Sequence, residues 1–180
     1  MSMEKYYKKK DIQKSIIKIV LAGRNVTAKN FNFVIENAHL LKKHFGNYKM
    51  DIYTDNFLSN IDNENINFLN FDEKIISKLC NYDILIFPSL YEGFPNLLLE
   101  ASYLGLTTVH SNFRFGSSEF KILENCHKFN LKNLSSFENA LLESKKTFYK
   151  NYNYFEKTNK FFNNFNKEIS CEDLRKKIII

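Results

Sequence analysis

The chain has 180 residues, of which 44% are hydrophobic and 26% charged, and its net charge is +6. This length and balance fit one globular domain with a substantial core and argue against wholesale disorder. The three cysteines and four histidines show no metal-ligand spacing, and no apolar run is long enough to span a bilayer. We therefore expect a reduced, cytoplasmic protein that needs no metal.

The first half of the chain alternates short apolar runs with helical patterns. Residues 1–15 are polar and basic, and we expect them to form a linker or tail. The β-branched run "IIKIVLAG" at residues 16–23 predicts a strand that is buried on both faces. Apolar residues at helical spacing predict one helix from Phe31 to Phe45, which Gly46 ends. Two further strands are expected, at 49–54 and 65–71.

The second half continues this alternation, and its helices have recognisable end signals. Residues 72–82 predict a helix with Asp72 as its N-cap. Pro95 is predicted to be the first residue of the next helix, and Gly105 to stop it. Ser135 and Glu138 have capping-box spacing at the start of a later helix. Other elements are expected as strands at 83–89, 106–111 and 126–131, a short helix from about Ser118, and a helical tail at 148–180.

Strands that are continuous apolar runs and alternate with helices are typical of a parallel sheet covered on both faces. The sequence therefore predicts an α/β, Rossmann-like doubly wound domain over residues 16–147. In such folds ligands bind where the strands end, near the first turns of the following helices. A doubly wound domain of the response-regulator kind is a competing interpretation, but the acidic cluster that it wants after the first strand is missing.

The loop "GRNVTAKN" that follows the first strand carries two cations, Arg24 and Lys29. Two positive side chains close to a helix N-terminus suit a phosphate or diphosphate. The simpler interpretation is that both are solvated surface residues.

The loop "PSLYEGFPN" that follows the strand at 83–89 carries further polar groups. Gly93 would let the backbone approach a ligand closely. Glu92 suits sugar hydroxyls, although a carboxylate beside a helix N-terminus is also favourable by itself. Asn96 and Glu100 share one helix face, and Glu100 stands among leucines, where a lone carboxylate is costly. It therefore binds either a ribose diol or an internal partner such as a lysine or a backbone N–H.

The stretch "PSLYEGFPNLLLEASYLGLTTVHS" resembles the glutamate-x7-glutamate motif of the retaining glycosyltransferases of family four, also called group 1, which have the GT-B fold. "VLAGRNVTAKNF" resembles the same family's strand–Gly-Arg–Lys-Asn segment, at the expected distance upstream. The resemblance runs from about Lys18 to Leu142. It implies the C-terminal, donor-binding half of a GT-B enzyme.

The resemblance also implies roles for individual residues. Arg24 and Lys29 would bind the diphosphate of a nucleotide sugar and stabilise the leaving nucleotide without a metal or other cofactor. Glu92 would bind hydroxyls of the donor sugar, and Glu100 the ribose. The remaining donor-binding residues that it implies are Gly23, Gly93, Phe94, Pro95, Asn96 and Leu97.

The second strand departs from the family pattern, because it runs into "IYTDNFLSN" where the family has a glycine-rich loop. This leaves the nucleotide base open. A GT-B enzyme also needs an N-terminal domain that binds the acceptor, so we expect such a partner in cis or in trans. The alternative is a non-catalytic or degenerate nucleotide-binding module. Basic clusters at 8–10 and 175–177 suit peripheral contact with the inner face of a membrane, or are simply solvated; we expect no nucleic acid.

Overall fold

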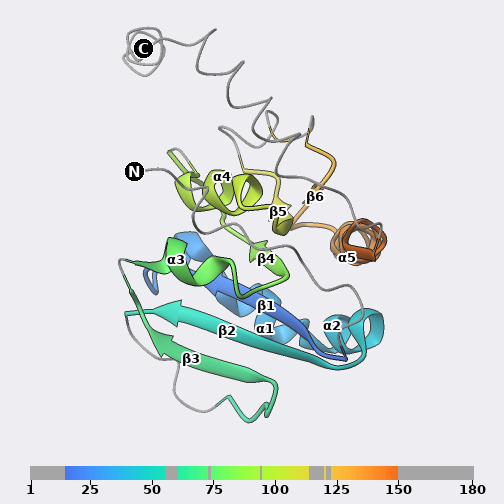
Figure 1. The fold of residues 1–180 in the computed structure, drawn as a ribbon. Coiled ribbons are helices and arrows are strands. Elements are labelled where there is room, and N and C mark those ends of the chain that lie inside the picture. Colours follow the sequence, from blue (N-terminus) through green and yellow to red (C-terminus); the bar gives the residue numbers. More distant parts are fainter. Residues whose placement is uncertain are drawn as a thin grey trace, which may run out of the picture.

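A computed structural model of the chain describes residues 15–55, 61–72, 74–93, 95–113, 120 and 123–149. The strands in these residues are β1 Ile17–Ala22, β2 Tyr48–Thr54, β3 Ile66–Asn70, β4 Ile84–Phe87, β5 Thr107–Ser111 and β6 Cys126–Phe129. They form one sheet in the order β3-β2-β1-β4-β5-β6, in which every neighbouring pair is parallel (Figure 1). The predicted doubly wound α/β fold is confirmed.

Helical segments connect the strands and cover both faces of the sheet. They are the 3-10 turn η2 Thr27–Lys29 and the helices α1 Phe31–Glu36, α2 Ala38–Phe45, α3 Ile75–Leu79, α4 Asn96–Tyr103 and α5 Leu134–Tyr149. Parallel strands need crossover connections, and the two hydrophobic clusters show that the helices divide between the two faces of the sheet. In Figure 1, α3 and α4 lie on one side of the sheet, and α2 and α5 lie together at the other.

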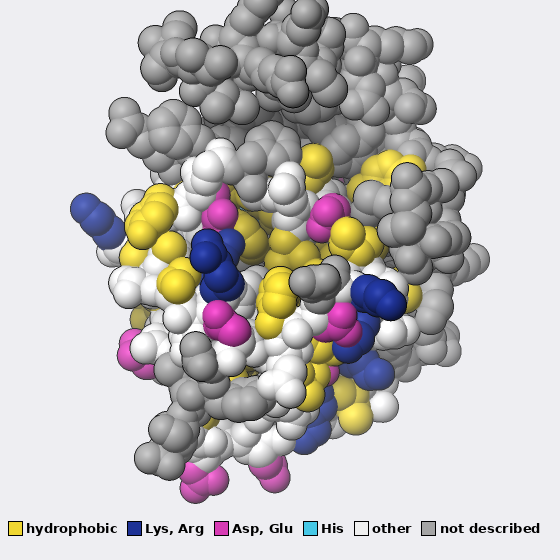
Figure 2. Space-filling model, turned by 90° about the vertical axis from the view of Figure 1, so that its left-hand side faces the viewer, with side chains coloured by type: hydrophobic (Ala, Val, Ile, Leu, Met, Phe, Trp, Pro, Cys, Tyr) yellow, Lys and Arg dark blue, Asp and Glu magenta, His cyan; other side chains and the backbone are white. Residues whose placement is uncertain are grey.

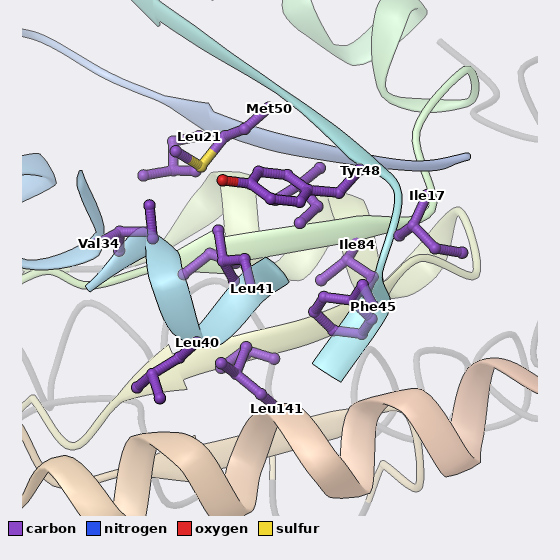
Figure 3. Packing of buried hydrophobic residues seen from close by; sticks show 14 of the residues in the cluster. Ile17, Leu21, Val34, Leu40, Leu41, Phe45, Tyr48, Met50, Ile84 and Leu141 are labelled. Carbon is purple, nitrogen blue, oxygen red and sulfur yellow. The ribbon is translucent and has the colours of Figure 1, made fainter. Parts of the chain in front are cut away.

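Each face of the sheet has its own hydrophobic core. On one face Ile19 and Leu21 of β1 pack among side chains from α1, α2 and α5, and Figure 3 shows this packing around Leu41 and Leu141. On the other face Val20 and its neighbours pack against α3 and α4. β1 is thus buried on both sides from Ile19 to Ala22, as its mostly apolar sequence predicts.

The central strands β1 and β4 are neighbours in the sheet, although η2, α1, α2, β2, β3 and α3 lie between them in sequence. The chain leaves β1 toward α1 on one face and leaves β4 toward α4 on the other. This is the topological switch point of a doubly wound sheet, where folds of this kind bind their ligands beside the loops that follow the two strands. The two loops in which the sequence predicts ligand-binding residues therefore meet at one place.

The helix predicted from Phe31 to Phe45 is wrong as a continuous element, because Asn37 divides it into α1 and α2. The Asn37 side-chain amide donates to the Phe33 carbonyl at 2.7 Å. An asparagine that binds the backbone locally competes with regular helix hydrogen bonding, which accounts for the break.

Three predicted helix starts are displaced in the structure. The predicted cap Asp72 lies ahead of α3, where its carboxylate accepts the Lys74 N–H at 2.8 Å. Pro95 occupies the cap position of α4 rather than its first turn. The capping box of Ser135 is wrong, because Asn133 caps α5 by accepting the Ser136 N–H at 3.1 Å. Gly105, with φ of +77°, does follow the end of α4 as predicted.

The C-terminal helix of the described region, α5, continues to Tyr149, and Phe148 is buried in the core. The expected linker at 1–15 and tail at 148–180 fall almost wholly outside the described residues, as does the short helix from Ser118. Within the described residues, none of the helices has the length and apolar character needed to cross a bilayer.

Candidate functional site

The loops after β1 and β4 are fastened to each other at the carboxyl edge of the sheet. The Leu90 N–H donates to the Ala28 carbonyl at 2.8 Å, and the Asn30 side-chain amide donates to the Pro88 carbonyl at 3.3 Å. Figure 2 looks onto the side toward which β2 and β3 point in Figure 1, where acidic, basic and hydrophobic side chains lie close together. The two loops therefore form one surface with a fixed mutual position.

An ion pair joins these loops. Lys29 Nζ donates to Glu92 Oε1 at 2.8 Å, and the two side chains are only 22% and 12% exposed. A charged hydrogen bond that is partly removed from water is stronger than a surface pair. The sequence predicts both residues as site residues, but for different parts of a ligand. The structure places them in direct contact.

The stem of Lys29 follows a path that two other residues define. Gly23 has φ of +152°, and a Cβ there would lie 3.0 Å from Lys29 Cε. The ammonium group lies over the ring of Phe87, at 5.2 Å from its centroid. A cation above an aromatic face is stabilised by the ring's charge distribution. The Lys29 side chain therefore passes Gly23 and the Phe87 ring on its way to Glu92.

Arg24 lies in the same loop but is exposed. Its guanidinium makes no hydrogen bond or ion pair with the part of the chain that the structure describes. The neighbouring Asn25 N–H donates to Asp55 Oδ1 at 2.6 Å, so the end of β2 is attached to this loop. Arg24 is thus available to an incoming anion, and Asp55 places a negative charge close to it.

Glu100 is half-buried on α4, and burial raises the pKa of its carboxyl above the usual value. Among the described residues, none donates a hydrogen bond to this carboxylate. The internal partner that the sequence left open is therefore not found among them. Asn96, one turn earlier on the same helix, is exposed. Burying a carboxylate without a hydrogen-bond donor costs folding free energy. We therefore expect a ligand to supply the donor to Glu100.

Gly93 is not required by packing in the way that Gly23 is. A Cβ at Gly93 would have no atom within 4 Å, so the fold itself does not require a glycine there. The open space is what close approach of a ligand to the backbone would need. Pro95 is buried, Leu97 of α4 packs against the core on that face of the sheet, and Phe94 lies outside the described residues.

Sequence reasoning missed several residues that shape the site. The sequence predicts Phe87 only as part of a buried strand. Nothing in the neighbouring sequence indicates that its ring lies under a cation. The hydroxyl of Ser89, a residue that is 1% exposed, has no hydrogen-bond partner among the described residues. The Ser111 hydroxyl donates to the Ser89 carbonyl and so connects β5 with the loop after β4.

Two other features bear on what the site could hold. In the described part of the chain, no group of three or more His, Cys, Asp or Glu side chains is arranged to hold a metal ion. A separate cavity of about 350 Å³ lies between α3 and the sheet, lined by Lys18, Lys49, Tyr53 and Tyr82 among others. It contains none of the residues that the sequence predicts for the site.

Comparisons with known proteins place the chain in a family. The family described as "Glycosyl transferases group 1" matches residues 17–143, which include both loops. A comparison with curated protein sequences gives no significant match.

Solved structures share the fold at low sequence identity. The C-terminal domain of LpcC, a glycosyl transferase group 1 family protein from Francisella tularensis, is 17% identical with a TM-score of 0.63; the match covers 87% of this chain and 95% of that one. The catalytic domain of the cholesterol-α-glucosyltransferase from Helicobacter pylori is 18% identical with a TM-score of 0.57, covering 81% and 98%.

A larger protein, TarM from S. aureus in complex with UDP and other ligands, is 18% identical with a TM-score of 0.69. The match covers 94% of this chain but only 36% of TarM. The present chain therefore spans about a third of the length of this relative.

Proposed function

Since the chain belongs to the group 1 glycosyl transferases, we propose that it is the donor-binding half of a retaining enzyme that transfers a sugar from a nucleoside diphosphate sugar to a hydroxyl group. The observation that carries the proposal is the meeting of Lys29 and Glu92 at the switch point of the sheet. A cation for phosphate and an acceptor for hydroxyls stand side by side there, as a molecule with a diphosphate next to a sugar requires.

The diphosphate is bound by Arg24 and Lys29. In the transfer, a bond forms between the acceptor oxygen and the anomeric carbon of the sugar, while the bond from that carbon to the diphosphate breaks. The hydroxyl proton leaves with the diphosphate, whose growing negative charge the two cations stabilise. Because these side chains supply the positive charge, the proposed reaction needs no metal. UDP in the TarM complex supports a nucleotide ligand for this fold.

The sugar and the ribose are bound from the side of α4. Glu92 accepts hydrogen bonds from hydroxyls of the donor sugar, and the backbone around Gly93 lines the pocket. Glu100 accepts from the two ribose hydroxyls, which supply the partners that its half-buried carboxylate lacks. The sugar keeps its anomeric configuration in the product.

The acceptor is bound by a second, N-terminal domain, in cis or in trans. The chain spans about a third of TarM, which leaves room for such a domain in the relative. We place the enzyme in the cytoplasm, with peripheral membrane contact through its basic clusters, and in bacterial glycan or glycolipid synthesis.

The test is calorimetric titration of the full chain with UDP, GDP and ADP, with and without Mg²⁺. One nucleotide should bind saturably without metal, and Arg24→Ala should weaken it by about 1.5–3 kcal/mol, or roughly 10- to 150-fold. Lys132→Ala removes an exposed positive charge after β6, the edge strand, and should change the affinity less than twofold. Equal losses in both variants, or binding that depends on Mg²⁺, would contradict the proposed site.

A second candidate is a non-catalytic module that binds a nucleotide without transferring a sugar. The attachment of Asp55 to the loop of Arg24 favours it, because this negative charge lies where the family has a glycine-rich loop. Sugar transfer by the chain together with an added N-terminal GT-B domain would support the enzyme. Nucleotide binding with neither transfer nor donor hydrolysis would support the module.

A further inference from the structure

The two residues that are proposed to bind different parts of a donor bind each other in the structure. Lys29 is assigned to the diphosphate and Glu92 to the sugar, yet their side chains form a hydrogen-bonded ion pair at 2.8 Å. We propose that Glu92 is a specificity-determining residue, which competes with phosphate for Lys29 and thereby makes the site prefer a nucleotide sugar over the free nucleoside diphosphate. This inference rests on the proposed function.

The competition follows from how Lys29 is held. Gly23 lets the stem pass, and the Phe87 ring lies beneath the ammonium group, so the position beside Glu92 is a defined one. When Lys29 turns toward a phosphate, its charged hydrogen bond to Glu92 is weakened or lost. Glu92 is only 12% exposed, so water replaces Lys29 poorly. A partly buried carboxylate that loses its counter-charge is expensive.

A donor sugar changes this balance because it brings its own hydrogen-bond donors. Its hydroxyl groups can donate to Glu92 while Lys29 moves to the diphosphate, so that both charged groups keep partners. A nucleoside diphosphate without a sugar offers Lys29 a partner but leaves Glu92 with none. The free nucleotide is therefore at a disadvantage that the nucleotide sugar does not have.

The same competition would help the product to leave. Once the sugar has been transferred, the hydroxyls that satisfied Glu92 are gone. Glu92 then attracts Lys29 back from the diphosphate and weakens the binding of the remaining nucleotide.

The test compares Glu92→Gln with wild type by calorimetry on the full chain. Glutamine keeps the size of the side chain and one acceptor oxygen but removes the charge that competes for Lys29. The probes are UDP, GDP, ADP, their glucose conjugates, and inorganic pyrophosphate, which needs no knowledge of the base. Glu138→Gln is the matched control, because Glu138 also pairs with a lysine, Lys43, and lies on α5. Circular dichroism verifies that each variant is folded.

We expect Glu92→Gln to bind the nucleoside diphosphate and pyrophosphate about five- to twentyfold more tightly than wild type. Its affinity for the nucleotide sugar should stay the same or fall, so that the preference for the sugar form shrinks. Glu138→Gln should leave every affinity within twofold. The gain should also disappear when Lys29→Gln is combined with Glu92→Gln, because no lysine is then released.

Other outcomes separate this inference from the proposed function. If wild type binds a nucleotide but Glu92→Gln binds it no more tightly, the competition is refuted while the donor site stands. A gain that persists in the Lys29→Gln background refutes it as well. If no nucleotide binds any variant but pyrophosphate binds Glu92→Gln more tightly, the competition stands and the donor site is refuted. If no probe binds any variant, both are refuted.

Discussion

Replacing Glu100 with glutamine is expected to make the empty domain more stable. The Glu100 carboxylate is half-buried, burial raises its pKa, and no described residue donates a hydrogen bond to it. The folded-state pKa thus lies above the unfolded value of 4.5, so ionisation at neutral pH costs folding free energy. Glutamine has nearly the same volume and helix propensity, so the packing of α4 is retained.

The size of the effect follows from the partial burial. A polar group that loses part of its hydration without a compensating hydrogen bond costs about 1–3 kcal/mol in proteins, and an exposed portion reduces this. We therefore expect Glu100→Gln to raise the free energy of unfolding by about 0.5–1.5 kcal/mol at pH 7.5. The gain should shrink as the pH is lowered toward 4, because the wild-type carboxyl becomes protonated.

The assay is urea denaturation of both proteins between pH 4 and pH 7.5. Glu64→Gln is the control, since Glu64 is exposed in the turn before β3, and its replacement should change stability by less than about 0.5 kcal/mol. The same Glu100→Gln variant should lose more affinity for a ribonucleotide than for its 2′,3′-dideoxy analogue. A variant that is less stable than wild type at pH 7.5 would show that Glu100 has an internal partner, and equal losses for both nucleotides would remove the ribose role.

Three further predictions concern the fold. Gly23→Ala should destabilise the domain by about 1–3 kcal/mol and weaken pyrophosphate binding, because φ is +152° and the new Cβ meets the Lys29 stem; unchanged stability in urea would contradict this. Burial lowers the pKa of His110 from 6.5 to about 4, so between these pH values the unfolded chain binds a proton on His110 and the folded chain does not. The free energy of unfolding should therefore fall by up to about 3 kcal/mol as the pH is lowered from 6.5 to 4. His110→Gln should reduce this decrease, and an unchanged slope would exclude His110 as its source. Asn133→Ala should lower the free energy of unfolding by about 0.5–2 kcal/mol through loss of the cap on α5, and Ser135→Ala should lower it by less. The reverse order in urea denaturation would show that Ser135 caps the helix after all.

The layers of the fold could be predicted because mostly apolar runs such as residues 16–23 require burial on both faces. Helix ends were less predictable. Asn37 breaks a helix through a hydrogen bond to a carbonyl four residues earlier. The helical spacing of the apolar residues around it does not indicate this break. At the N-terminus of α5, both Asn133 and Ser135 are good caps, and sequence alone does not rank them.

The loops that form the site could be located from the sequence, but the contact between them could not. Lys29 and Glu92 are 63 residues apart, and their pairing depends on β1 and β4 being neighbours. Nothing local to Phe87 indicates that its ring lies under Lys29. Such contacts are properties of the sheet order and of side-chain paths rather than of any single segment.

The most direct test of the proposed donor site is hydrogen exchange of backbone amides with and without the nucleotide that binds. The proposed site predicts added protection in residues 23–30 and 88–100, and none in the residues of β2 and α3 that line the separate cavity of about 350 Å³. Protection confined to that cavity, around Lys49 and Tyr82, would show that the nucleotide binds elsewhere and would contradict the assignment of Lys29, Glu92 and Glu100.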